Sequence, residues 1–251
     1  QVVLLTFNVN IYENGVVLNQ KHNQDSLIKA IEEKAEVLLL LLELHEFQAT
    51  FFIEISIAER LEKLLKKISF NGHEIALYNI NSTVDFTEIT KQNIEDILDK
   101  PIRGLRQKQH QFSYQEIQKM EFKYVSEIDE SSINFLWRKL TSRTYLHIEN
   151  DVNVIPESQS PYSQLPFNDY VLQVTPMKYY ENMLLESLKN NDYVMIYANA
   201  WQLFSSSESP FKLPFYKKIN NGRKFEDRLE QLFQFIDENE IAVARMKDYL
   251  F

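Results

Sequence analysis

Apolar and polar residues follow two different periods along this chain, and the two periods alternate. Short runs in which almost every residue is apolar, β-branched or aromatic are typical of buried strands. We expect strands of this kind at residues 2–7, 49–53, 74–78, 102–105, 122–125 and 193–197. Longer segments with an apolar residue every three or four positions indicate helices that bury one face. We expect these helices at residues 25–47, 56–68, 87–98, 114–120, 176–189 and 225–237.

Capping and turn residues support several of these boundaries. Either Asp25 or Ser26 is a suitable N-cap for the first helix, and Ser56 is a suitable N-cap for the second. The pair Asn71-Gly72 ends the second helix, because glycine readily adopts the left-handed backbone found there. Residues 130–170 carry turn formers and no clean period, which predicts an irregular crossover with short extended pieces.

Strands that alternate with helices are typical of parallel βαβ units. Right-handed crossovers close such units into a barrel, and the functional residues of a barrel lie at the carboxyl ends of its strands. With only four glycines and no break in composition, we expect one α/β domain over residues 1–251, built as a distorted (β/α) barrel. The strand ends to inspect are therefore Asn8, Asn10, 78–82, 103–109 and 199–202.

Composition and charge narrow the classes of function. The chain is 44% hydrophobic and 25% charged, which is enough apolar material for a buried core. Its formal net charge of −9 repels nucleic acid and anionic membranes, so we expect neither as a partner, whereas neutral ligands such as sugars suit it. The longest apolar run, 37–42, is far shorter than the ~20 residues of a membrane-spanning helix, so we expect no membrane span.

The cysteine and histidine counts restrict the chemistry further. The chain has no cysteine, which excludes disulfides, cysteine-ligated zinc and a thiol nucleophile. None of the five histidines lies three or four positions from another, which excludes a helical two-histidine metal site. The sequence leaves the compartment open. The cytoplasm is slightly favoured, and a processed, exported form stays possible because the chain begins at Gln1 rather than at Met.

Five segments at the predicted strand ends occur in an order and spacing that are specific. They are "LLTFNVNIY", "QATFFIEISIAERLEKLLKKISFNGHEIALYN", "KPIRGLR", "MEFKYVSEID" and "YVMIYANAWQLF". Together they resemble the polysaccharide deacetylase family, the NodB-homology carbohydrate esterases, which remove acetyl groups from glycans with the help of a divalent metal such as zinc. The resemblance spans nearly the whole chain and implies the barrel fold of that family. The later segment that begins at Trp201 is most similar to a bacterial branch associated with exported polysaccharide.

The resemblance also implies where an active site belongs. The family uses a carboxylate base, a metal held by a second carboxylate and two histidines, an arginine that steadies the base, and a late histidine as general acid. On this chain the base position is Asn8, the metal positions are Asn10, Tyr78 and Ser82, the acid position is Asn199, and Lys108 stands where a proline is usual. Only the arginine, Arg106, is kept.

These substitutions remove the groups that the reaction needs. An amide accepts no proton at neutral pH, so Asn8 cannot act as the base. Asn10, Tyr78 and Ser82 offer neutral oxygens, a poor set for zinc, which binds Cys, His and carboxylate. We therefore expect a degenerate member without catalytic residues and without a metal cofactor. The alternative for Asn8 and Asn10 is that they are only turn residues at the end of a strand.

Two functions are compatible with this sequence. The first is a catalytically inactive, deacetylase-like protein that binds a polysaccharide or oligosaccharide, or serves as a scaffold for a protein partner, in bacterial surface or exopolysaccharide metabolism. The second is an active carbohydrate deacetylase, or another hydrolase of C–N bonds, that uses a relocated site. The acids available to a relocated site are Asp85, Glu127, Asp129 and Asp151.

The candidate ligand-binding residues are Tyr12, Tyr78, Arg106 and Trp201. Flat rings at strand ends can stack on the faces of sugars. Packing in the core or at the rim is the alternative for Tyr197 and Trp201. Arg106 either binds a ligand oxygen at the barrel mouth or pairs with an acid such as Glu74 or Asp129.

Overall fold

The structure, a computed structural model, describes residues 1–11, 17–18, 23–108, 111–128 and 145–251. Its main sheet has nine strands, in the order β11-β1-β3-β4-β5-β6-β8-β7, with β9 paired to β1. The strands are β1 (Val2–Val9), β3 (Thr50–Glu54), β4 (Glu74–Tyr78), β5 (Gly104–Lys108), β6 (Tyr124–Ile128), β7 (His147–Glu149), β8 (Val152–Pro156), β9 (Tyr193–Asn199) and β11 (Ala242–Ala244). All paired neighbours are parallel except β7 and β8. A separate two-stranded sheet joins β2 (Val17–Leu18) to β10 (Phe211–Lys212).

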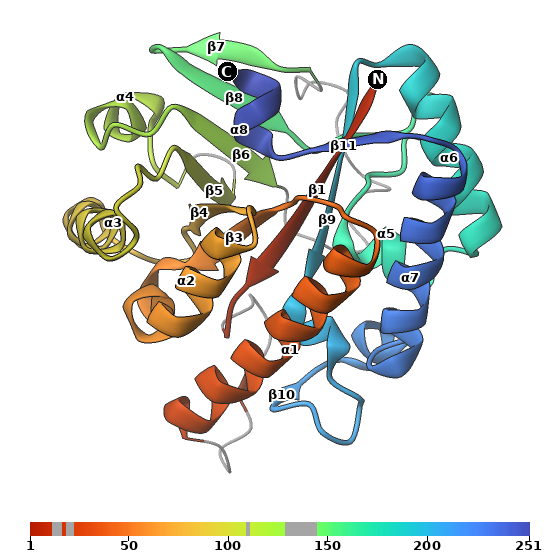
Figure 1. Cartoon of the computed structure of the whole chain (residues 1–251), viewed down its shortest axis with the longest axis horizontal. Helices are drawn as coiled ribbons and strands as arrows, with labels where there is room; N and C mark the ends of the chain where they lie inside the picture. Colours follow the sequence, from red (N-terminus) through yellow and green to blue (C-terminus); the bar gives the residue numbers. More distant parts are fainter. Residues whose placement is uncertain (12–16, 19–22, 109–110, 129–144) are drawn as a thin grey trace.

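Helices cover the outer face of this sheet (Figure 1). They are α1 (Gln24–Leu44), α2 (Glu62–Phe70), α3 (Val84–Leu98), α4 (Tyr114–Lys119), α5 (Asp169–Val174), α6 (Met177–Asn190) and α7 (Arg223–Glu238). The last helix, α8 (Met246–Leu250), packs against the inner core instead. The 3₁₀ turns are η1 (Ile55–Leu61), η3 (Ala200–Leu203) and η4 (Phe215–Lys218). No helix in these described ranges is long and apolar enough to cross a membrane.

Strand β1 pairs with three other strands along its two edges. Strand β9 pairs with residues 2–8 of β1 on one edge. On the other edge, β11 pairs with residues 2–4 and β3 pairs with residues 6–9. Seven of the eight β1 residues are buried, which explains the nearly continuous apolar run at the start of the sequence.

The sheet curls into a half-barrel that stays open between β8 and β9. The segment after β8 lies along the free edge of β9, where Ser158 Oγ accepts from the Met195 N–H (2.8 Å) and the Phe167 carbonyl accepts from the Tyr197 N–H (3.3 Å). Backbone groups at this edge are therefore satisfied without a closing strand. The expected α/β fold, a distorted barrel, is confirmed.

Side chains alternate between the two faces of the sheet, as strands require. Odd-numbered residues of β1, such as Leu5 and Phe7, belong to the large core under the helices. Even-numbered residues point into the half-barrel, where a second core contains Leu4, Phe52, Tyr124 and Met195. The inner core is smaller because polar side chains occupy much of the barrel interior.

Several element boundaries differ from the sequence expectation. The segment predicted as one helix over 56–68 begins as the 3₁₀ turn η1 and becomes α-helical only at Glu62. Asn23, rather than Asp25 or Ser26, is the N-cap of α1, since its side chain accepts from the Ser26 N–H at 2.8 Å. The strands β7, β8 and β11 and the helices α5 and α8 were not predicted as separate elements; β7 and β8 correspond to the extended pieces expected within 130–170.

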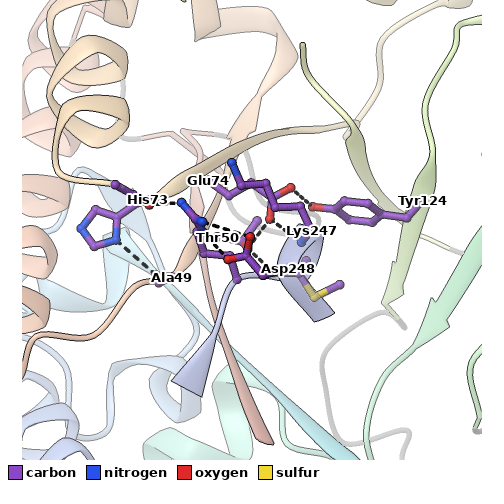
Figure 2. A network of polar contacts seen from close by, with 10 residues as sticks. Ala49, Thr50, His73, Glu74, Tyr124, Lys247 and Asp248 are labelled. Atoms are coloured by element: carbon purple, nitrogen blue, oxygen red, sulfur yellow. Dashed lines mark hydrogen bonds and ion pairs between the residues drawn. The ribbon is translucent and has the colours of Figure 1, made fainter. Parts of the chain in front are cut away.

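Helix α8 seals the end of the half-barrel at which the strands begin (Figure 2). Its first backbone N–H groups lack partners within the helix. The Met246 N–H donates to Thr50 Oγ1 (2.9 Å), and the Lys247 N–H donates to Glu74 Oε2 (3.0 Å). Glu74 also accepts from Thr50 (2.8 Å) and from the Tyr124 hydroxyl (2.9 Å), so this buried carboxylate joins α8 to β3, β4 and β6.

Gly104 makes room for the Tyr124 ring that reaches Glu74. A Cβ atom on Gly104 would stand 2.1 Å from Cζ and 2.2 Å from the hydroxyl oxygen of Tyr124. We expect Gly104→Ala to lower the free energy of unfolding by about 1–3 kcal/mol, because the ring must move and its bond to Glu74 is lost. Urea denaturation of Gly104→Ala, Tyr124→Ala and the double variant would measure this. If the double variant loses as much unfolding free energy as the two single variants together, the clash between residues 104 and 124 does not cause the loss in Gly104→Ala.

His73 gives stability a defined dependence on pH. Its Nδ1 accepts from the Ala49 N–H (3.2 Å), and burial, together with nearby Arg245, lowers its pKa to about 4. The unfolded chain, with an ordinary pKa of ~6.5, binds more protons between these values. The contribution of neutral His73 to the free energy of unfolding is therefore fully present above pH 6.5, and it is lost as the pH falls towards 4.

We expect this loss to reach about 1–3 kcal/mol in the free energy of unfolding, after allowance for solvent screening. Glu74, whose pKa burial raises, acts in the opposite sense, so variants must be compared with the wild type. Urea denaturation between pH 4 and 7 should give a flatter profile for His73→Gln than for the wild type, and His147→Gln serves as the control. The same profile in His73→Gln and wild type would rule out this assignment.

Candidate functional site

Three of the positions named by the resemblance meet inside the half-barrel, near the carboxyl ends of its strands. Asn8 lies in β1, Asn199 ends β9, and Arg106 lies in the middle of β5. Asn8 and Asn199 are direct neighbours in the parallel register of β1 and β9. All three side chains are buried, with Arg106 at 0% exposure.

Arg106 is a buried cation, and its hydrogen-bond acceptors among the described residues are all uncharged. Its Nη1 donates to Asn8 Oδ1 (2.6 Å), its Nη2 to Thr6 Oγ1 (2.9 Å) and its Nε to Ser126 Oγ (3.1 Å). The Sδ atom of Met195 is a weaker acceptor at 3.6 Å from Nη2. The guanidinium also lies 3.8 Å from the ring centroid of Phe52, where the face of the ring is attractive to a cation.

Burial lowers the pKa of Arg106 to about 10, because removal from water penalises the charged form. Tyr197, Tyr78, Tyr124 and Glu157 oppose this shift. A pKa near 10 still leaves Arg106 positively charged at neutral pH. The pairing with Glu74, one of the alternatives for Arg106, is not formed, since Glu74 bonds to other groups at the opposite end of the strands. Asp129, the other acid considered for this pairing, lies outside the described residues.

A chain of two amides connects this cation to a buried carboxylate. Asn8 accepts from Arg106 through Oδ1 and donates through Nδ2 to Asn199 Oδ1 (2.9 Å). Asn199 in turn donates through Nδ2 to Asp169 Oδ2 (2.8 Å). Because Arg106 only donates and an ionised Asp169 only accepts, the orientation of both amides is fixed. The positions at which the resemblance expects a base and an acid thus hold neutral groups that are hydrogen-bonded to each other.

The proposed metal positions do not form a suitable ligand set. Asn10 is buried just after β1, Tyr78 ends β4 at 5% exposure, and Ser82 is half-buried beyond β4, where its backbone N–H donates to Asn79 Oδ1 (2.9 Å). No group of three or more His, Asp or Glu side chains in the described ranges could hold a metal ion. Both polar atoms of Asn8 are engaged by Arg106 and Asn199. The residues present therefore do not fit the divalent metal of the deacetylases.

Three buried acids that the sequence did not single out contribute to this end of the barrel. Glu54 ends β3 and accepts from the Ile11 N–H (2.7 Å) and from Ser56. Glu157 follows β8 and accepts from the Tyr197 hydroxyl (2.8 Å), while Asp169 begins α5. Glu54 could have been found from its place at a strand end, whereas nothing in the local pattern marks Asp169.

The candidate aromatic residues differ in their placement. Trp201 is 1% exposed and packs edge to face on Phe211 with ring centroids 6.2 Å apart. In this structure its ring has no open face for a sugar, which favours the core-packing alternative. Tyr197 is likewise buried, at 2% exposure. Tyr12 lies outside the described residues.

The acids proposed for a relocated site show no shared arrangement in the described ranges. Glu127 is buried and accepts from the Tyr114 hydroxyl at 3.0 Å. Asp85 is exposed in the first turn of α3, and Asp151 is exposed in the turn before β8, where it accepts from Gln118 at 3.3 Å. Lys108, at the end of β5, is half-buried.

Comparison with known proteins gives no match to a family model and no match to a curated protein. Among solved structures, a probable polysaccharide deacetylase from Pseudomonas aeruginosa is 12% identical, with 98% of this chain and 88% of that chain covered and a TM-score of 0.62. An allantoinase is 11% identical, with 98% and 87% covered and a TM-score of 0.63.

A pseudoenzyme of the CE4 family from Bacillus anthracis is also similar. It is 12% identical, with 100% of this chain and 65% of that chain covered and a TM-score of 0.52. A mutant of that protein is described as having restored enzymatic activity. The resemblance seen in the sequence is thus confirmed in three dimensions, and the chain has the fold of the polysaccharide deacetylases.

We expect zinc to leave the thermal stability of this protein unchanged, because Asn10, Tyr78 and Ser82 supply no charged or imidazole ligand. A ligand that binds only the folded state at 100 times its Kd adds ~2.7 kcal/mol, which a melting curve detects readily. Scanning calorimetry with and without micromolar zinc makes the measurement. A clear increase in Tm that Tyr78→Ala abolishes would contradict this expectation.

The matched control restores the charged ligands. The variant Asn8→Asp, Asn10→Asp, Tyr78→His and Ser82→His places two carboxylates and two imidazoles at the four positions, so it should acquire measurable zinc affinity by titration calorimetry. Its affinity should fall ~10–100-fold short of a native site, because groups that orient the imidazoles are missing. If the variant folds and binds no zinc, the four positions do not converge.

Proposed function

We propose that this protein is a catalytically inactive protein of the deacetylase fold that binds a glycan in bacterial surface-polysaccharide metabolism. The observation that carries the proposal is the chain from Arg106 through Asn8 and Asn199 to Asp169. It occupies the positions at which the resemblance expects a base and an acid. Structural neighbours described as deacetylases support the class of ligand, and a neighbour described as a pseudoenzyme provides a precedent for this fold without activity.

The chemistry of the amide chain supports the absence of catalysis. Deacetylation needs a group that takes a proton from water and a group that returns one to the leaving amine. Asn8 and Asn199 can do neither, because an amide is neutral over the physiological pH range. Each is also held by a neighbour on both sides, so neither amide is available to orient an attacking water without breaking the chain.

The same chemistry suits a neutral, hydroxyl-rich ligand. Besides the two engaged amides, the inner side of the half-barrel near Asn8 carries tyrosine hydroxyls and the buried acids Glu157 and Asp169. Sugar hydroxyl groups both donate and accept, so they can bond to such a mixed set, whereas an anionic ligand is repelled by the acids. Arg106 is enclosed and acts indirectly, by fixing Asn8. Tyr78 is also mostly buried, at 5% exposure, but it ends β4, and we propose it as the ring that a ligand at the strand ends contacts.

The test is a binding measurement paired with an activity assay. An acetylated oligosaccharide selected by array screening should bind the wild type, and Tyr78→Ala should weaken binding about tenfold, the equivalent of ~1.4 kcal/mol for a lost aromatic contact. Tyr162→Ala, at a tyrosine that is 76% exposed, is the matched control and should bind as the wild type does. No acetate should be released by either protein.

Two results would overturn the proposal. Release of acetate with a turnover that survives removal of trace metal would show a relocated active site and favour the enzyme alternative. An array without any saturable glycan ligand would exclude the binding role and leave the scaffold role, which co-purification with a protein partner from the polysaccharide machinery would then test.

A further inference from the structure

A polar pocket of about 580 Å³ lies at the opposite end of the half-barrel, where the strands begin. The end of α2, the start of β4, the segment between α3 and β5, and helix α8 surround it. Its volume is within the ~300–1,000 Å³ of pockets that hold small molecules. It shares no lining residue with the chain of amides at the other end of the strands, so a ligand of this pocket is independent of the proposed function.

The pocket collects positive charge on a protein whose net charge is −9. Four cationic side chains line it, Lys100, Arg103, Arg245 and Lys247, against two acidic ones, Glu74 and Asp248. This leaves an excess of two positive charges, four minus two. The excess is local, because the remainder of the protein must then carry a net charge of −11.

The two acids of the pocket already have partners. Asp248 accepts from Arg245 through both carboxylate oxygens, one of them at 3.0 Å from Nη2. Glu74 is buried and accepts from Tyr124, Thr50 and the backbone of Lys247 (Figure 2). Among the described residues, neither carboxylate is within ion-pair distance of the side chains of Lys100, Arg103 or Lys247.

The three remaining cations form no ion pair in the described part of the chain, although Lys247 lies near the charged groups of Arg245, Glu74 and Asp248. Lys100 donates to Ser69 Oγ (2.8 Å), and Arg103 lies over the ring of Phe251, 5.6 Å from its centroid. The ammonium group of Lys247 is partly buried beside Arg245, and both burial and that neighbouring charge lower its pKa. His73, with its pKa near 4, adds no charge at neutral pH. A bound anion would relieve the repulsion among these groups.

We propose that this pocket binds a small organic phosphate monoester, with the phosphate held by Arg103 and Lys247. A phosphate monoester carries a charge of about −1.5 to −2 at pH 7, which matches the excess charge of the pocket. Arginine and lysine are the side chains that proteins use for phosphate, as a planar fork and a point charge respectively. The apolar side chains of Leu98, Pro101 and Phe251 line the same pocket and receive the organic group.

The test uses phenyl phosphate as the probe, titrated calorimetrically into the wild-type protein at constant ionic strength. The double variant Arg103→Gln, Lys247→Gln keeps the hydrogen bond from the backbone N–H of residue 247 to Glu74, so α8 keeps this contact with β4. We expect the wild type to bind the probe saturably. In the double variant the affinity should fall at least about tenfold, because the phosphate loses its charged hydrogen-bond donors at positions 103 and 247. Lys63→Gln, Lys224→Gln removes the same charge at exposed lysines outside the pocket, and this variant should bind as the wild type does.

Further arms identify the ligand chemistry. Inorganic phosphate should bind more weakly than phenyl phosphate, because it leaves the apolar wall uncovered, and benzoate should bind more weakly because it carries one charge. Equal loss of affinity in both double variants would show a general charge effect and overturn the proposal. So would tighter binding of benzoate, or no saturable binding of phenyl phosphate at 10 mM, about the weakest affinity of interest for a specific site. Should the double variant unfold, the single variant Arg103→Gln, at an exposed position, must still weaken binding of the probe.

Discussion

A guanidinium enclosed in a barrel must find an acceptor for its N–H groups, and this requirement organises the interior around Arg106. The acceptors come from β1, β6 and β9, so the side chain joins four strands of the curled sheet, its own β5 included. Water is replaced by hydroxyl, amide and thioether groups and by the face of Phe52. A buried charge without such compensation would cost several kcal/mol.

The carboxyl group of Asp169 is connected to Arg106 through side chains rather than by direct contact. The two amides link Arg106 to Asp169 by hydrogen bonds. Arg106 donates to Asn8 and so fixes its orientation, and Asn8 donates to Asn199 and so fixes the next amide. A carboxylate in place of Asn8 would face the acceptor Asn199 Oδ1, and a carboxylate in place of Asn199 would face the acceptor Asp169 Oδ2. The neutral residues at these positions are therefore adapted to one another, and they are not simply an enzyme site with its charges deleted.

Much of the fold could be predicted from the sequence, because the strongest signals are local. The apolar run 74–78 coincides with β4, and the periodic segment 225–237 lies within α7. The short strand β11 and helix α8 were missed, since each is held by contacts with distant strands and not by its own pattern. At the site, the family resemblance placed Asn8, Arg106 and Asn199, which do meet. Asp169 was not found because its role depends on a crossover that brings α5 beside β9. The local pattern of apolar and polar residues does not indicate such a crossover.

The pairing of β1 with strands from both ends of the sequence has a consequence for the order in which the molecule assembles. The first strand in the chain pairs with β9 and β11, so that Val2 lies beside both Tyr193 and Ala242. Contacts this distant in sequence are formed slowly, because a long loop must close before they can form. During synthesis β1 therefore has only β3 to pair with until most of the chain has emerged. An apolar strand with one edge unpaired is a target for chaperones and for aggregation, and it remains so until β9 arrives.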